Sequence, residues 1–232
     1  MVENRGERVA GIYEQNKKII IDHTHPQYIA KWRSMTGGRY NGAYYYSIEI
    51  VKNIIPNVKT TRNWVTINMP GRAVNHAAVF IHNNLHPQNY GWLGNYKDLV
   101  LVCGVPETCD KVKHLGKAIY LPLSIDVAEV QKYKRPKDKE VCFAGRPAKR
   151  KAANLPPGID ILEGLPRDEM LAELARFKRA FCVGRTAIEA RALGCEVLPY
   201  DPRYPDVSRW QVVDNQEAAA ILQAHLDEID NH

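Results

Sequence analysis

The sequence lacks the features that mark membrane and secreted proteins. It contains no run of about 20 apolar residues, the length that a helix needs to cross a bilayer. Its first residues, Met1 to Arg5, are polar, and no apolar segment typical of a signal peptide follows them. We therefore expect a cytoplasmic protein without a membrane span.

The sequence is also poor in the patterns of disulfide frameworks and metal sites. Its five cysteines are an odd number and include no Cys-x-x-Cys pair, so we expect reduced thiols in the core. His23 and His25 stand two residues apart at the end of an extended segment, where their side chains point to opposite sides. No Asp-x-Asp pair occurs. These absences predict a protein that needs no bound metal.

The charge of the chain is concentrated in one segment. The 232 residues carry a formal net charge of +6. Between Gln131 and Lys151, nine basic residues face two acidic ones, a net charge of +7, so the rest of the chain sums to −1. A local basic patch of this kind is typical of a phosphate-binding site or of a docking strip for nucleic acid.

Short apolar runs alternate with amphipathic segments along most of the chain, which predicts an α/β protein with parallel sheets. The runs that we interpret as strands cover 18–22, 58–60, 64–67, 77–81, 98–103, 118–123, 140–144, 159–162, 179–183, 195–200 and 210–213. The segments that favour helices cover 45–55, 106–114, 167–178 and 185–193, and a final helix begins at 214–217. The charged stretch at 130–139 is the best candidate for a linker, because Pro136 interrupts it.

The stretch from 179 to 201 holds the strongest candidate for a binding site. A strand leads into a turn at Gly184, a helix follows, and Gly194 ends the helix before the next strand. The start of such a helix presents backbone N–H groups at the carboxyl end of a strand, where α/β sheets bind ligands. Arg185 and Thr186 open this helix, and Glu189 lies one turn further on, within reach of a sugar hydroxyl. Alternatively, Glu189 only pairs with Arg185 on a solvated face of the helix.

Three further segments place polar residues after strands or in glycine-rich loops. His82 directly follows the run 77–81, where it either faces a ligand or caps a turn. Gly37 and Gly38 begin a loop that either approaches a sugar or forms a surface turn. Arg146 follows the run 140–144 in a Gly-Arg turn, with Lys151 five residues later; these cations either bind a diphosphate or belong to a solvated surface.

The segment Gly184 to Ala190, followed by Gly194 and the apolar pair Val197 and Leu198, resembles the donor-site signature of GT-B-fold glycosyltransferases. The second half of the chain is similar to that of glycosyltransferase family 4. This resemblance implies that Glu189 binds the ribose of a nucleotide-sugar. It also implies that Glu189→Ala weakens the binding of a nucleoside diphosphate while leaving the fold intact. The chain departs from the family at Cys182, where many members have an acidic residue that contacts the donor sugar.

The resemblance extends to other motifs of the chain. It implies that Arg146 and Lys151 hold the donor diphosphate, with Arg185 assisting, and that fixed cations stabilise the departing nucleotide without a metal. It places His82 near the transferred sugar and favours retention of the anomeric configuration. The glycines Gly37 and Gly38 correspond to a sugar or acceptor loop.

Together these interpretations predict two Rossmann-like domains of the GT-B type, 1–130 on the acceptor side and 131–232 on the nucleotide-sugar side, with a cleft between them. The expected activity is metal-independent transfer of a sugar from a donor such as a UDP- or GDP-sugar, with no other cofactor. Two alternatives rest on the basic segment 132–151. The chain could be a non-catalytic module that binds nucleic acid, or a glycosyltransferase whose acceptor is DNA.

Overall fold

The computed structural model describes residues 12–15, 18–21, 46, 49–66, 73–81, 87–145, 155–201, 204 and 206–231. The chain forms two compact units. The first comprises Met1–Pro122 together with Gln216–His232, and the second comprises Leu123–Asn215. Each unit contains a four-stranded parallel sheet, so the expected α/β class with parallel sheets is confirmed. None of the helices in the described ranges combines the length and apolar character that a membrane span requires.

The sheet of the first unit has the simple order β3-β4-β5-β6, and every pairing is parallel. Its members are β3 (Asn63–Val65), β4 (Ala77–Ile81), β5 (Leu99–Cys103) and β6 (Lys117–Tyr120). All five residues of β4 and all five of β5 are buried, as the continuous apolar runs predict for central parallel strands. A separate antiparallel pair is formed by β1 (Ile12–Gln15) and β2 (Lys18–Ile21).

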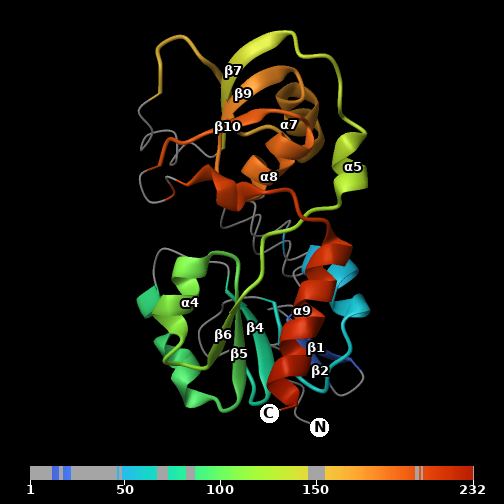
Figure 1. Cartoon of the computed structure of the whole chain (residues 1–232), viewed down its shortest axis with the longest axis vertical. Coiled ribbons are helices and arrows are strands. Elements are labelled where there is room, and N and C mark those ends of the chain that lie inside the picture. The colour runs from blue at the N-terminus through green and yellow to red at the C-terminus, as the bar shows by residue number, and fades with distance from the viewer. Residues whose placement is uncertain are drawn as a thin grey trace. The chain divides into compact units, whose positions relative to one another are not determined.

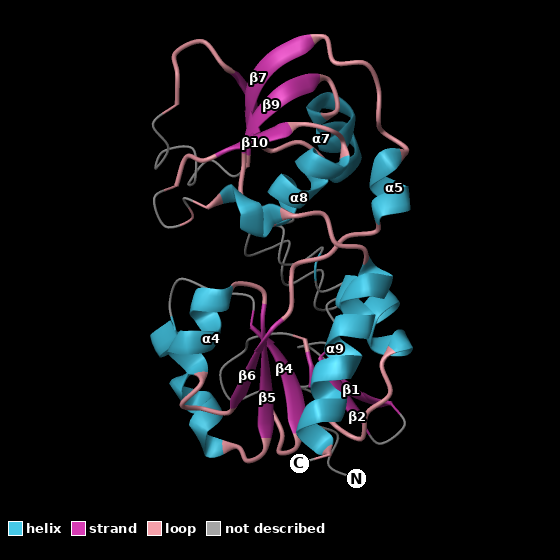
Figure 2. Ribbon diagram, viewed as in Figure 1, coloured by secondary structure: helices cyan, strands magenta, loops and turns pink. Residues whose placement is uncertain are grey.

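Helices from both ends of the sequence belong to the first unit (Figure 2). They are the short π-helical and 3₁₀ turns η1 (Ile50–Ile54) and η2 (Ile55–Asn57), the 3₁₀ helix η3 (Pro87–Asn95), α4 (Pro106–Val112) and α9 (Asn215–Asp230). Tyr90 and Leu93 of η3 pack into the core against β4 and β5. The last helix of the chain, α9, thus completes the unit that contains the first strands.

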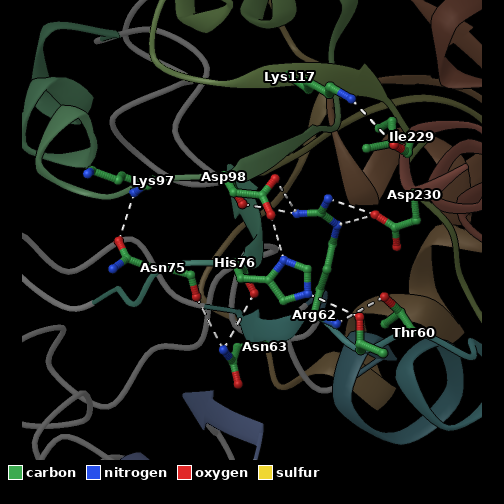
Figure 3. A network of polar contacts seen from close by, with 11 residues as sticks. Thr60, Arg62, Asn63, Asn75, His76, Lys97, Asp98, Lys117, Ile229 and Asp230 are labelled. Atoms are coloured by element: carbon green, nitrogen blue, oxygen red, sulfur yellow. Dashed lines mark hydrogen bonds and ion pairs between the residues drawn. The ribbon is translucent and has the colours of Figure 1, made fainter. Parts of the chain in front are cut away.

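A buried arginine ties α9 to the sheet of the first unit (Figure 3). Arg62, just before β3, donates from Nε and Nη2 to Oδ1 of Asp230 at 2.9 and 2.7 Å. Its Nη1 donates to the carbonyl and Oδ1 of Asp98 at 3.0 and 3.1 Å. Because Arg62 is buried, these two carboxylates provide the countercharge that its guanidinium needs. The end of α9 is therefore fixed to the amino edge of the sheet.

His76 extends this network along the same edge. Its Nδ1 lies 2.6 Å from Oδ2 of Asp98, and its Nε2 lies 3.1 Å from the hydroxyl of Thr61. His76 and Asp98 precede β4 and β5, and both have a positive φ, 52° and 53°. Such backbone is uncommon for residues other than glycine. The side-chain contacts provide a reason for it, and the bond from His76 together with Arg62 lowers the pKa of the Asp98 carboxyl below its ordinary value of 3.8.

The sheet of the second unit has the order β10-β9-β7-β8, again with parallel pairings only. Its strands are β7 (Lys139–Ala144), β8 (Asp160–Leu162), β9 (Phe177–Phe181) and β10 (Glu196–Leu198). The helices are α5 (Val127–Gln131), α7 (Arg167–Leu174), α8 (Arg185–Ala192) and the 3₁₀ helix η4 (Val207–Trp210) (Figure 1). Phe143, Phe177 and Leu171 are buried in the core of this unit. Unlike in the first sheet, the order of the strands reverses at β7: β8 lies on one side of β7, and β9 and β10 lie on the other.

Three expected elements differ in the structure. The helix expected over 167–178 ends at Leu174, because Phe177 already pairs with Lys139 as β9 joins the central strand β7. The strand expected at 210–213 is absent from these described residues. Val207–Trp210 forms a 3₁₀ helix, and only Asp214 makes a parallel bridge, to Ile125. The strand expected at 58–60 is irregular backbone.

The two units divide the sequence differently from the expected bounds of 1–130 and 131–232. Residues 123–130 belong to the second unit and 216–232 to the first. The segment expected to be a linker is held within the second unit, where Asp138 pairs with Arg176 at 2.8 Å and Lys137 lies 3.3 Å from the sulfur of Cys195. These assignments depend on contacts between residues distant in sequence.

We predict that Asp230→Ala lowers the free energy of unfolding by about 1.5–3 kcal/mol, the usual contribution of hydrogen bonds to a charged group, because buried Arg62 loses two of them. Urea denaturation measures the effect. Asp227→Ala is the matched control, since Asp227 is an exposed acid of the same helix whose carboxylate accepts from Gln223 and not from Arg62. Its effect is expected within about 0.5 kcal/mol. Equal losses in the two variants would show that Arg62 does not depend on Asp230.

We predict that Asp98 contributes stability that is lost in acid. Its pKa is lowered in the folded state, so this contribution is present above the ordinary pKa of 3.8 and disappears as the pH falls through the lower folded value. Asp98→Asn keeps a side chain that tolerates positive φ but cannot ionise. The free energy of unfolding of this variant is expected to fall less steeply below about pH 4 than that of the wild type. Parallel curves in urea denaturation at several pH values would refute this role.

Candidate functional site

Four of the nine residues predicted for the site lie in the described part of the chain, and all four are at the start of α8. They are Gly184, Arg185, Thr186 and Glu189. The remaining five lie outside the described residues: Gly37, Gly38, His82, Arg146 and Lys151. The geometry of the site is therefore built from α8 and its neighbours.

The order of the second sheet places the start of α8 at a position where α/β proteins bind ligands. The strand order reverses at β7, with β8 on one side and β9 on the other. In open parallel sheets such a reversal leaves a crevice at the carboxyl ends of the two diverging strands. The connection after β9 leads through Gly184 into α8, and the connection after β7 begins at Gly145. Gly145 donates to the carbonyl of Leu162 at 3.2 Å, so it lies at the carboxyl edge beside β8.

The turn before α8 requires glycine. Gly184 has φ 63° and ψ −141°, a conformation that residues with a side chain rarely adopt. An added Cβ would meet nothing within 4 Å, so the backbone angle and not the available space selects glycine. The carbonyl of Gly184 accepts from the N–H groups of Ala187 and Ile188 at 3.0 and 3.3 Å. A helix that starts in this way directs the N–H groups of its first turn outward from the strand end.

The other end of α8 is fixed by the expected glycine stop. Gly194 has φ 80°, and its N–H donates to the carbonyl of Arg191 at 2.8 Å. The N–H of Cys195 donates to the carbonyl of Ala190, also at 2.8 Å. This pair of bonds is the Schellman motif that ends many helices. With both ends fixed and most side chains buried, α8 holds Arg185 and Glu189 in defined positions.

Glu189 forms a buried ion pair with Arg185. Nε of Arg185 donates to Oε1 of Glu189 at 2.9 Å, and the two side chains are only 4% and 3% exposed. The i, i+4 pairing expected from the sequence is therefore present, but it lies inside the protein and not on a solvated face. Removing one partner of a buried pair usually costs about 3–5 kcal/mol. We expect Glu189→Ala to destabilise the fold, so it is not the neutral probe that the sequence suggests.

A second arginine, which the sequence patterns did not select, also contacts Glu189. Arg167 is the first residue of α7, and its Nε and Nη2 donate to the same Oε1 at 3.3 and 3.1 Å. Its side chain is 15% exposed. The crossings from β8 to β9 and from β9 to β10 run in the same direction along the sheet. The right-handed rule for such crossings puts α7 and α8 on one face (Figure 1).

The sequence distinguishes Arg167 by one feature: it is a cation in the first turn of an expected helix. Cations are unfavourable in the first turn of a helix, because the helix dipole places partial positive charge there. Arg167 and Arg185 both break this preference; the first turn of α7 also contains Asp168 and Glu169, whereas that of α8 contains no acidic residue. A first-turn arginine at the carboxyl edge of a parallel sheet indicates an acidic partner or an anionic ligand. Glu189 supplies one negative charge for two positive ones.

The side chains of Arg167, Arg185 and Glu189 sum to a charge of +1, beside Asp168 and Glu169 in the first turn of α7. The partial charges of both helix ends add to it. An anion such as a phosphate would be stabilised by this arrangement, since the cations are already fixed and partly removed from water. All described hydrogen bonds to the carboxylate end on Oε1. The chemistry of the group suits a ligand that offers both an anion and a hydroxyl donor.

Cys182 occupies the position where the GT-B pattern often has an acid. The thiol is buried at the end of β9 and donates to the carbonyl of Ala180 at 3.7 Å. Burial raises its pKa well above the ordinary value of 9.0, so it is neutral at physiological pH. It provides no negative charge for contact with a sugar. As expected, all five cysteines are free, and only Cys109 is not fully buried.

The described side chains include no group of three His, Cys, Asp or Glu residues placed to hold a metal ion.

Comparisons of the chain with protein-family models, with curated proteins and with solved structures find no match. The resemblance to GT-B glycosyltransferases thus stays a prediction from the motifs.

Proposed function

We propose that the second unit binds the nucleoside diphosphate part of a nucleotide-sugar and that the protein is a metal-independent glycosyltransferase of the GT-B type, acting in the cytoplasm. The observation that carries the proposal is the buried carboxylate of Glu189 between Arg167 and Arg185, at the starts of α7 and α8. A nucleoside diphosphate offers the two chemical groups that this site suits, an anion and a ribose hydroxyl.

In this proposal the positive charge and the helix ends bind the diphosphate. Arg185 and the first turn of α8, including the Thr186 hydroxyl, lie at the start of the helix that follows β9. Arg146 follows Gly145 directly in sequence, and Gly145 lies at the adjacent carboxyl edge of β7. Chain connectivity thus supports a role for Arg146, and with it Lys151, on the same diphosphate. These cations would stabilise the charge that develops on the nucleotide as the sugar bond breaks.

Glu189 would bind the ribose through its second oxygen. The arginines in the described ranges occupy Oε1, so Oε2 is the oxygen that would accept a hydrogen bond from a ribose hydroxyl. The first unit would provide the acceptor side, with His82 near the transferred sugar and the loop at Gly37 and Gly38 near the sugar or acceptor. Reaction with retention of configuration follows from the resemblance for His82.

The nucleic-acid alternative gains no comparable support from the described part of the basic segment. Several of its cations contact groups of the protein itself: Lys132 pairs with Glu129, Arg135 donates to the carbonyl of Ala172, and Lys139 pairs with Asp160 at 2.9 Å. The two ion pairs reduce the positive charge available to a polymer backbone. DNA remains one candidate for the acceptor of the sugar.

We predict that a nucleoside diphosphate raises the melting temperature of the full chain. UDP, GDP, ADP, their sugar derivatives and a short DNA duplex are compared by thermal shift. A ligand that binds only the folded state at 100 times its Kd stabilises it by about 2.7 kcal/mol. A shift with one base and its sugar derivative is the expected result. A shift with the duplex alone, steeply reduced by salt, would replace the proposal with the nucleic-acid module.

We predict that Arg146→Gln and Lys151→Gln each weaken the best nucleotide by about tenfold or more, because each removes charge-assisted bonds to phosphate. Thr186→Val, which keeps the size of the side chain, is expected to weaken it several-fold. Calorimetry measures the Kd values. Lys134→Gln is the control, since Lys134 is an exposed cation of the same basic segment and has no proposed role. Equal losses in the Arg146, Lys151 and Lys134 variants would indicate a general effect of charge and not a diphosphate site.

A further inference from the structure

Arg167 holds Glu189 from a different part of the chain than Arg185 does. Arg185 precedes Glu189 by one turn on the same helix, whereas Arg167 comes from the start of α7. Arg185 donates to Oε1 through Nε, and Arg167 donates to the same oxygen through Nε and Nη2. Three N–H groups from two helices therefore converge on one oxygen of a carboxylate that is 3% exposed.

This convergence limits the rotation of the carboxylate. A single bond from Arg185 would allow the group to turn about its terminal side-chain bond, which is a soft torsion. The two bonds from α7 fix the side on which Oε1 lies, and with it the direction of Oε2. Glu189 does not contact Arg167 through both of its oxygens, as in a bidentate pair, so the second oxygen keeps its acceptor capacity.

We propose that Arg167 is a positioning residue that orients Oε2 of Glu189 toward a ribose hydroxyl and so makes the site selective for ribonucleoside over deoxyribonucleoside diphosphates. This inference rests on the proposed function, because it assumes that a nucleoside diphosphate occupies the site. Arg167 acts through Glu189 and does not itself contact the phosphates. A deoxyribonucleotide that lacks the hydroxyl would leave a buried, fixed acceptor without a donor, which lowers its affinity.

Binding measurements distinguish this positioning role of Arg167 from direct phosphate binding and from a purely structural role. If Arg167 bound phosphate directly, its loss would weaken ribonucleotides, deoxyribonucleotides and inorganic diphosphate to the same extent. If it served only the fold, its loss would lower the melting temperature and leave the selectivity for ribose unchanged. A positioning role predicts that selectivity for ribose falls and that inorganic diphosphate loses only the attraction of one nearby positive charge, which is less than the loss of a direct phosphate contact.

Calorimetry on the full chain tests the proposal. The tightest of UDP, GDP and ADP is compared with its 2′-deoxy and 3′-deoxy forms and with inorganic diphosphate. The wild type is expected to prefer the ribonucleotide over at least one deoxy form by about tenfold or more. In Arg167→Met, which keeps the aliphatic part of the side chain, this ratio is expected to approach one. Arg167→Lys is expected to restore part of it, because an ammonium group can reach Oε1 but not with the planar fork of arginine.

Arg176→Gln is the matched control. Arg176 lies just beyond the other end of α7 and pairs with Asp138 and Glu173, not with Glu189. It is expected to keep the wild-type ratio. An unchanged ratio in Arg167→Met overturns the inference. If that variant does not fold, an unchanged ratio in Arg167→Lys overturns it instead. A wild type that binds no nucleoside diphosphate refutes the proposed function itself, and one that binds without preference for ribose refutes only the inference.

Discussion

The carboxylate of Glu189 is buried against two guanidinium groups, and a charge in that position is stable only while its partners remain in place. The partners come from the starts of two helices, so the arrangement depends on how the second sheet is wound. Because β8 and β9 flank β7 in parallel, the chain emerges from both strands at the same edge. Two crossings in one direction then place α7 and α8 on the same face, where Arg167 and Glu189 meet.

The first unit uses a buried arginine in a related way. Arg62 receives its countercharge from Asp98, just before β5, and from Asp230, at the end of the last helix. Desolvation of the guanidinium makes both acids necessary to its stability. This contact attaches the final helix to the first sheet. The two buried arginine clusters differ in balance: Arg62 has two acidic partners, whereas Glu189 has two basic ones, and only the second excess suits an anionic ligand.

The positions of Arg167 and Arg185 are unfavourable for folding alone. Both arginines lie in first turns and oppose the helix dipoles; Asp168 and Glu169 offset this in α7, whereas the first turn of α8 contains no acidic residue. Local rules of this kind are broken most often where a protein binds or reacts. The turn at Gly184, at the same edge, has a backbone conformation that is unfavourable for other residues and that glycine tolerates. Both features lie at the starts of helices that follow strands of the second sheet.

The class of the fold and most of its elements follow from local patterns of residues. The apolar runs at 77–81 and 140–144 and the glycine-bounded helix at 185–193 specify local structure, since burial of apolar side chains and positive φ at Gly184 and Gly194 act within a few residues. The tertiary structure decided what depends on distant partners. It ended the helix before Phe177, assigned α9 to the first unit and brought Arg167 to Glu189, 22 residues away in sequence. Patterns of local spacing contain no information about such contacts, because strand order and crossing direction create them.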